Sequence, residues 1–89
     1  MKHRVANYTV VIEKQKRMGT DTWSQMAFVP LLGIATEADT VEEVEIAIND
    51  LIQFHIDTLA EEGESIPVET ENPLITRSEV SLPRGAVIQ

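Results

Sequence analysis

The chain has 89 residues, a length that fits one domain and excludes two. It has no cysteine, which excludes a disulfide scaffold, a thiolate metal site and a cysteine nucleophile. No apolar run reaches the roughly 18 residues of a membrane-spanning helix. Residues 1–4 are charged but lack the apolar core of a secretory signal, so we expect a cytoplasmic protein.

The net charge of −8 is unevenly distributed. Residues 1–36 carry a net charge of +3 and residues 72–89 a net charge of +1, whereas residues 37–71 carry twelve acidic residues and no lysine or arginine. This acidic block repels phosphate, which argues against a nucleic-acid-binding surface there. It suits a basic protein partner. The alternative is a solvated acidic helix face that keeps the protein soluble.

The N-terminal half predicts three strands. Residues 8–13 are rich in β-branched side chains, and residues 22–29 alternate in character after a polar loop, so the two segments are expected to form a hairpin. Pro30 and Gly33 then indicate a turn. Residues 34–36 are apolar enough for a short third strand.

A long helix is predicted after these strands. Thr40, followed three residues later by Glu43, forms a capping box, and Asp39 suits the positive end of a helix. Apolar residues then recur with a helical period as far as Leu59, and Gly63 is placed for a left-handed C-terminal cap. The pattern predicts a helix of about 22 residues that covers one face of the sheet.

A last strand is predicted at residues 78–82, where polar and apolar side chains alternate. We therefore expect an α+β domain over residues 1–68, followed by a linker and strand over residues 69–89. A core this small leaves little stability, and an unpaired strand is an exposed edge. We expect the strand to form a homodimer or a higher homo-oligomer through Val80 and Leu82.

The sequence offers no catalytic or metal site. His3 lies near the terminus and His55 lies on the apolar helix stripe, and no paired-histidine motif is present, so neither a metal nor another cofactor is predicted. The adjacent carboxylates Glu42 and Glu43 point about 100° apart on a helix rather than toward each other. The serines lack a nucleophile-elbow context, and no glycine-rich phosphate loop occurs. We therefore expect no enzymatic activity.

Two aromatic residues leave one alternative open. Tyr8 and Trp23 fall on the two predicted hairpin strands and could stack on RNA bases, with the basic residues of 14–17 beside them. The simpler interpretation is that both side chains pack under the helix.

The order of these motifs resembles the HicB family, which comprises the antitoxins of HicA–HicB toxin–antitoxin systems and solitary HicB-like proteins. The resemblance covers about residues 5–68: two strands, a proline–glycine turn, a short strand, an acidic helix entry, a long helix and a Gly-x-x-Ile-Pro ending. Leu31 and Ala38 depart from the family pattern, where an acid and a glycine are common. The residues that match it are Pro30, Leu32, Gly33, Asp39, Thr40, Glu42, Glu43, Gly63 and Pro67.

The resemblance implies a partial RNase-H-like fold of the α+β class, in the order β-β-β-α-β, without the catalytic carboxylates. It has an antiparallel sheet, covered on one face by one long helix, and a C-terminal strand. The chain resembles the short form of the family that lacks a DNA-binding module, so we expect no DNA binding without an added domain.

The resemblance also implies a function. A non-catalytic HicB-like antitoxin would bind and neutralise a small basic HicA-type toxin that cleaves mRNA, by covering its RNA-binding face and active site. The acidic residues expected to contact it are Glu42, Glu45, Asp57 and Glu61. The alternative function is a solitary HicB-like module that binds RNA or another ligand and has no toxin partner. A degenerate nuclease is a third possibility.

Overall fold

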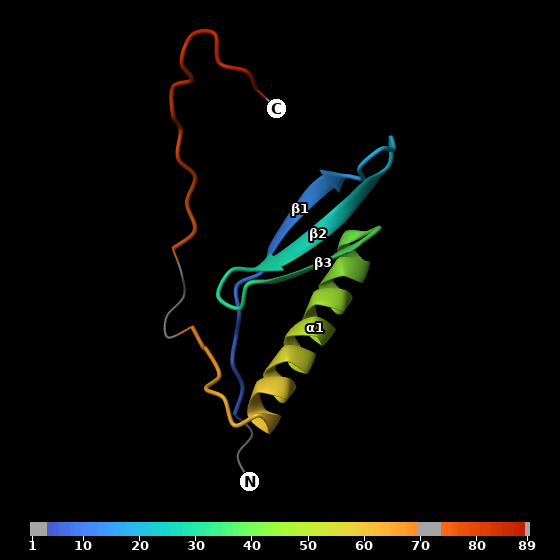
Figure 1. Cartoon of the computed structure of the whole chain (residues 1–89), viewed down its shortest axis with the longest axis vertical. Coiled ribbons are helices and arrows are strands. Elements are labelled where there is room, and N and C mark those ends of the chain that lie inside the picture. Colours follow the sequence, from blue (N-terminus) through green and yellow to red (C-terminus); the bar gives the residue numbers. More distant parts are fainter. Residues whose placement is uncertain (1–3, 70–73, 89) are drawn as a thin grey trace.

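A computed structural model of the chain describes residues 4–69 and 74–88. The strands form one antiparallel sheet in the order β1-β2-β3, and the helix packs on one of its faces (Figure 1). The predicted α+β class, with three antiparallel strands followed by one long helix, is confirmed. In chain order the elements are β1 (Val11–Lys16), β2 (Trp23–Val29), β3 (Ile34–Ala38) and α1 (Val41–Glu61).

The turn between β2 and β3 forms as the sequence predicts. Gly33 has a φ of +66°, a left-handed conformation that a residue with a Cβ adopts only with strain. Its N–H donates to the Val29 carbonyl oxygen at 2.8 Å and closes the turn. Because Pro30 has no N–H, β2 ends at the residue before it.

The ends of α1 also lie where the sequence predicts. The Thr40 hydroxyl accepts a hydrogen bond from the Glu43 N–H at 3.1 Å. It also donates to the Glu43 carboxylate at 3.1 Å, a variation on the usual capping box. At the other end Gly63 has a φ of +70°, and its N–H donates to the Ala60 carbonyl oxygen. These two caps satisfy backbone groups that the helix itself leaves unpaired.

The hydrophobic core is small and lies between α1 and the sheet. Its fully buried apolar side chains are Ala27 and Val29 of β2 and Val44 and Ile48 of α1. The helix packs mainly on β3 and β2. Consequently β1, at the edge of the sheet, is the strand least covered by α1.

The first strand differs from its prediction. It begins at Val11, three residues later than expected, and continues to Lys16. The ladder explains the shift: Val11 pairs with Phe28, so a ladder continued to Thr9 would meet Pro30, which cannot donate a hydrogen bond. Pairing with β2 also extends β1 over residues 14–16, which the sequence predicts to lie in the loop.

The predicted C-terminal strand is wrong for the isolated chain. Residues 78–82 have no regular secondary structure, and both Val80 and Leu82 are exposed. A β-strand needs a neighbour to accept and donate its backbone hydrogen bonds. Figure 1 shows instead that residues 74–88, called the tail below, extend beyond the body formed by residues 4–69. Part of the predicted linker, residues 70–73, lies outside the described residues.

Candidate protein-binding surfaces

The outer face of α1 is acidic but includes two exposed hydrophobic side chains. The helix carries six acidic residues and no lysine or arginine. Ile46 and Phe54 are 66% and 70% exposed, although they lie on a helix that packs on a sheet. Asp50 lies between them at a spacing of four residues, so the three share one side of the helix. The outer face consists of Glu42, Ile46, Asp50, Phe54, Asp57 and Glu61.

Three of the four acidic residues predicted to bind a partner lie on this face. Glu42, Asp57 and Glu61 are exposed there, whereas Glu45 lies on another side of the helix, where it lines a groove described below. The two apolar residues were missed by the sequence analysis. Neither residue belongs to the set of apolar residues that recurs with the helical period and predicts the buried side of α1. Their position outside that set would have identified Ile46 and Phe54 as surface residues.

The C-terminal end of α1 is electrostatically unfavourable for the isolated chain. Glu61, Glu62 and Glu64 lie at or just beyond the end of the helix, and its last turn contains no basic residue. Helix C-termini carry partial negative charge and favour cations. A basic group from a partner would therefore be attracted to this end of the outer face.

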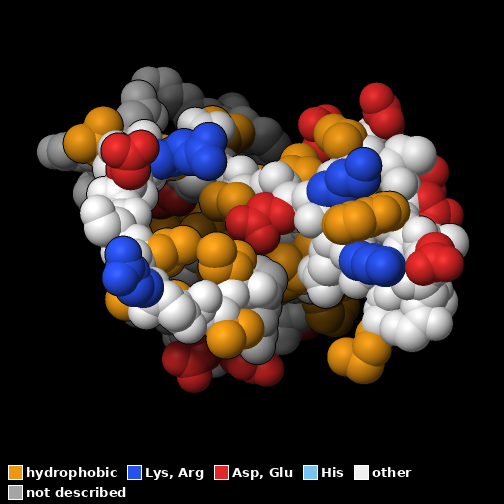
Figure 2. All heavy atoms as spheres, turned by 90° about the horizontal axis from the view of Figure 1, so that it is seen from above, with side chains coloured by type: hydrophobic (Ala, Val, Ile, Leu, Met, Phe, Trp, Pro, Cys, Tyr) orange, Lys and Arg blue, Asp and Glu red, His pale blue; other side chains and the backbone are white. Residues whose placement is uncertain are grey.

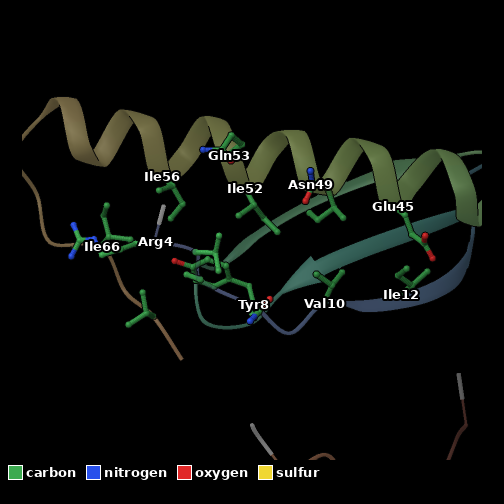
Figure 3. Close-up of a pocket in the computed structure, with 15 residues that line it drawn as sticks. Arg4, Tyr8, Val10, Ile12, Glu45, Asn49, Ile52, Gln53, Ile56 and Ile66 are labelled. Atoms are coloured by element: carbon green, nitrogen blue, oxygen red, sulfur yellow. The ribbon is translucent and has the colours of Figure 1, made fainter. Parts of the chain in front are cut away.

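A groove of about 1130 Å³ lies between α1 and the N-terminal edge of the sheet. Figure 3 shows Ile52 and Ile56 projecting from α1 toward the segment that contains Tyr8 and Val10. The groove exists because α1 packs mainly on β3 and β2 and covers β1 least. Its lining is Arg4, Val5, Ala6, Asn7, Tyr8, Val10, Ile12, Glu45, Ile48, Asn49, Ile52, Gln53, Ile56, Ile66 and Val68.

A set of hydrogen bonds, called the clasp below, holds the segment after α1 at the end of this groove. The Tyr8 hydroxyl donates to the Pro67 carbonyl oxygen at 2.6 Å. The Thr9 N–H and hydroxyl donate to the two oxygens of the Glu69 carboxylate at 2.7 and 2.9 Å. Partial burial raises the pKa of Tyr8, and the nearby Glu69 carboxylate raises that pKa further. Pro67, a residue of the family pattern, thus takes part through its backbone.

Trp23 does not pack under the helix as the simpler interpretation predicts. It is 52% exposed, and the Lys14 ammonium lies 5.4 Å from the centre of its ring. The last pair between β2 and β3 is Gln25 with Ala38, so Trp23 extends past the part of the sheet that α1 covers. Tyr8, by contrast, packs against the core.

The structure describes one of the two histidines. His55 is partly buried on α1, and His3 lies outside the described residues. Within residues 4–69 and 74–88, no group of three or more histidine, aspartate or glutamate side chains is arranged to hold a metal ion.

The chain matches no family model, no curated protein and no solved structure. Among the residues that the structure describes, no helix combines the length and the apolar character needed to cross a bilayer.

Proposed function

We propose that this chain is a non-catalytic HicB-like antitoxin that binds a small basic HicA-type toxin through the outer face of α1. The observation that carries the proposal is the exposure of Ile46 and Phe54 within an acidic surface. Bound in this way, the antitoxin would cover the RNA-binding face and active site of the toxin and stop it from cleaving mRNA.

The chemistry of the outer face suits a protein partner. Ile46 and Phe54 are eight residues apart, about 12 Å along a helix at 1.5 Å per residue, which is close enough for one partner to contact both. Binding energy at protein interfaces is concentrated in a few apolar anchors surrounded by polar contacts. The surrounding carboxylates would attract a basic protein and orient it during association.

The fold is compatible with this function. The order of three strands and one long helix agrees with the part of the HicB pattern that precedes the last strand. An inhibitor of this kind needs no catalytic groups of its own, because it acts by occupying the surface that the toxin uses for RNA.

Coexpression tests the proposal. A tagged form of this chain is produced with a HicA-type toxin encoded beside its gene. We expect the two proteins to copurify and the toxin to lose its mRNA-cleaving activity. Active toxin in the presence of excess antitoxin would overturn the proposal.

Two variants distinguish the contribution of the acidic side chains of the outer face from that of its apolar side chains. Glu42→Lys with Asp57→Lys should slow association and reduce its dependence on salt, whereas Phe54→Ser should speed dissociation. The matched control is Glu13→Lys with Asp21→Lys, which makes the same change in net charge away from α1. If the control slows association as much as the helix variant, net charge alone explains binding and the outer face is not the interface.

The alternative function, a solitary module that binds RNA, is favoured by one observation. Trp23 is half-exposed beside Lys14, and an aromatic ring with a nearby cation can stack on a base. Trp23 is the only tryptophan in the chain, so its fluorescence reports directly on this position. Quenching by single-stranded RNA at physiological salt would favour the alternative, and no change is expected if the chain acts as an antitoxin.

A further inference from the structure

Asp50, in the middle of the outer face, has an exposed carboxylate with no cation beside it. On the surface of a helix, the neighbours of a residue lie three and four positions away, where a lysine or arginine can pair with an acid. Because α1 carries no lysine or arginine, no side chain of the helix neutralises Asp50. Among the residues that the structure describes, no hydrogen bond or ion pair involves the Asp50 carboxylate. Its charge is therefore free to attract a group from another molecule.

The cations of the β1–β2 hairpin pair with other acids. The Arg17 guanidinium forms an ion pair with the Asp39 carboxylate. The Lys16 ammonium lies 3.7 Å from a carboxylate oxygen of Asp21. Figure 2 shows lysine and arginine side chains among hydrophobic and acidic ones on the face seen from above. The outer face of α1 has no such mixture of charges, since all its charged side chains are acidic.

Phe54 brings an aromatic ring next to this carboxylate. Residues four positions apart on a helix have Cβ atoms about 5–6 Å apart, and Cα–Cβ bonds tilt toward the N-terminus of the helix. The ring of Phe54 is therefore carried toward Asp50 rather than away from it. An acidic surface alone would serve solubility, but a phenyl ring exposed within it does not. A group that binds here meets a carboxylate and an aromatic ring together.

We propose that the outer face of α1 binds an arginine side chain of the basic partner, with the guanidinium group paired with Asp50 and stacked on the ring of Phe54. This inference rests on the proposed function, which supplies a basic protein as the partner. A guanidinium group is planar, donates two parallel N–H bonds to a carboxylate and stacks on aromatic faces. The methylene groups of the same side chain pack on Ile46, the exposed apolar residue on the other side of Asp50.

A lysine suits this pair of groups less well. Its ammonium is a compact and strongly hydrated point charge, which cannot present a flat face to a ring and two parallel donors to a carboxylate. General attraction between opposite charges treats arginine and lysine alike. A preference for arginine therefore distinguishes a site built from Asp50 and Phe54 from an acidic surface that attracts any cation.

Asp57 is the other acidic residue close to Phe54, three positions after it on the outer face. Its carboxylate already accepts a hydrogen bond from the Gln53 side-chain amide at 3.0 Å. Asp50 has no such partner, which favours Asp50 as the residue that binds the guanidinium group. Asp57 supplies the matched control, because its substitution changes the charge equally on the same face of the helix.

Two peptides of equal charge, hexa-arginine and hexa-lysine, test the site without any toxin. Their dissociation constants are measured at physiological salt by NMR, from the backbone amide shifts at positions 50 and 54. We expect hexa-arginine to bind about two- to fivefold more tightly than hexa-lysine. Asp50→Asn and Phe54→Leu should each bring the two dissociation constants close together, whereas Asp57→Asn should weaken both peptides and keep their ratio.

All three substituted side chains are exposed, so the core stays intact, and circular dichroism verifies this. Equal affinities of the unaltered chain for the two peptides would overturn the proposal. So would the absence of binding by either peptide, or a preference for arginine that survives both Asp50→Asn and Phe54→Leu.

Chemical protection tests the same site in the complex with the toxin. Phenylglyoxal modifies arginine side chains, and mass spectrometry identifies which ones react. We expect the complex to protect one arginine of the toxin and Phe54→Leu to remove that protection. A complex that forms without protecting a toxin arginine would overturn this inference and leave the proposed function standing, whereas failure to form a complex would overturn both. Protection of Arg77 or Arg84 of this chain instead would assign the face to a second copy and also overturn the inference.

Discussion

The body and the tail are both rich in apolar residues, yet only the body has folded around them. In the body, Val44 and Ile48 of α1 are buried against Ala27 and Val29 of β2. In the tail, the hydrophobic side chains stay in solvent, and the residues that alternate like a strand form none. The difference lies in the neighbours: each element of the body packs against or pairs with the next element in sequence. The described part of the tail instead lies apart from α1 and the sheet (Figure 1).

The largest contrast is expected from truncating one apolar side chain in each region. Ile48→Ala should lower the free energy of unfolding by about 2–5 kcal/mol, because Ile48 is 3% exposed and its removal leaves a cavity between α1 and the sheet. Leu74→Ala in the tail should change it by less than about 0.5 kcal/mol, since Leu74 is 91% exposed. Chemical denaturation of both variants at low protein concentration measures the difference. Equal losses would show that the tail belongs to the folded body.

The same comparison can be made with two threonines. Thr40→Ala removes the hydroxyl that caps α1. It should lower the free energy of unfolding by about 1 kcal/mol, because the Glu43 N–H loses its acceptor. Thr76→Ala is the control, because among the described residues the Thr76 hydroxyl hydrogen-bonds only to the adjacent Arg77 carbonyl oxygen, at 3.4 Å. Thermal melting should show a lower midpoint for the first variant and no change for the second. A midpoint unchanged by Thr40→Ala would mean that α1 is held by packing alone.

Local signals explain which parts of this fold could be predicted from the sequence. Thr40, Gly33 and Gly63 act through hydrogen bonds or backbone angles within a few residues, so both helix ends and the central turn were predicted correctly. The start of β1 was not predicted correctly, because it depends on Pro30, which lies in the turn after a different strand.

The candidate surfaces were predictable only in part. Charge is visible in the sequence, and three of the four acidic residues expected to bind a partner lie on the outer face of α1. The groove was not predictable, because it depends on which strands the helix covers. The side of α1 that contains Glu45 faces the groove only because the helix packs on β3 and β2.

The smallest expected effect concerns the clasp, where the body meets the segment that leads to the tail. Tyr8→Phe keeps the ring but removes the hydroxyl that donates to the Pro67 carbonyl oxygen. A hydrogen bond of this kind contributes about 0.5–1 kcal/mol, so the free energy of unfolding should fall by that amount. Urea denaturation at neutral pH measures it, and Phe28→Leu on the far side of the sheet controls for changes in aromatic packing. If the free energy of unfolding falls as much as it does for Ile48→Ala, Tyr8 stabilises the fold mainly by packing in the core and not by its hydrogen bond.

The pH dependence of the same variant separates the hydrogen bond from packing. The pKa of Tyr8 is raised in the folded chain, chiefly by burial and then by the Glu69 carboxylate, so folding favours the protonated phenol. The contribution of this group to stability is therefore fully present below the unfolded pKa near 10 and is lost as the pH rises through the higher folded pKa. The wild-type chain should lose stability over that interval relative to Tyr8→Phe, which has no group to ionise there. If the two chains show the same alkaline loss, other groups cause it and the clasp does not depend on the Tyr8 proton.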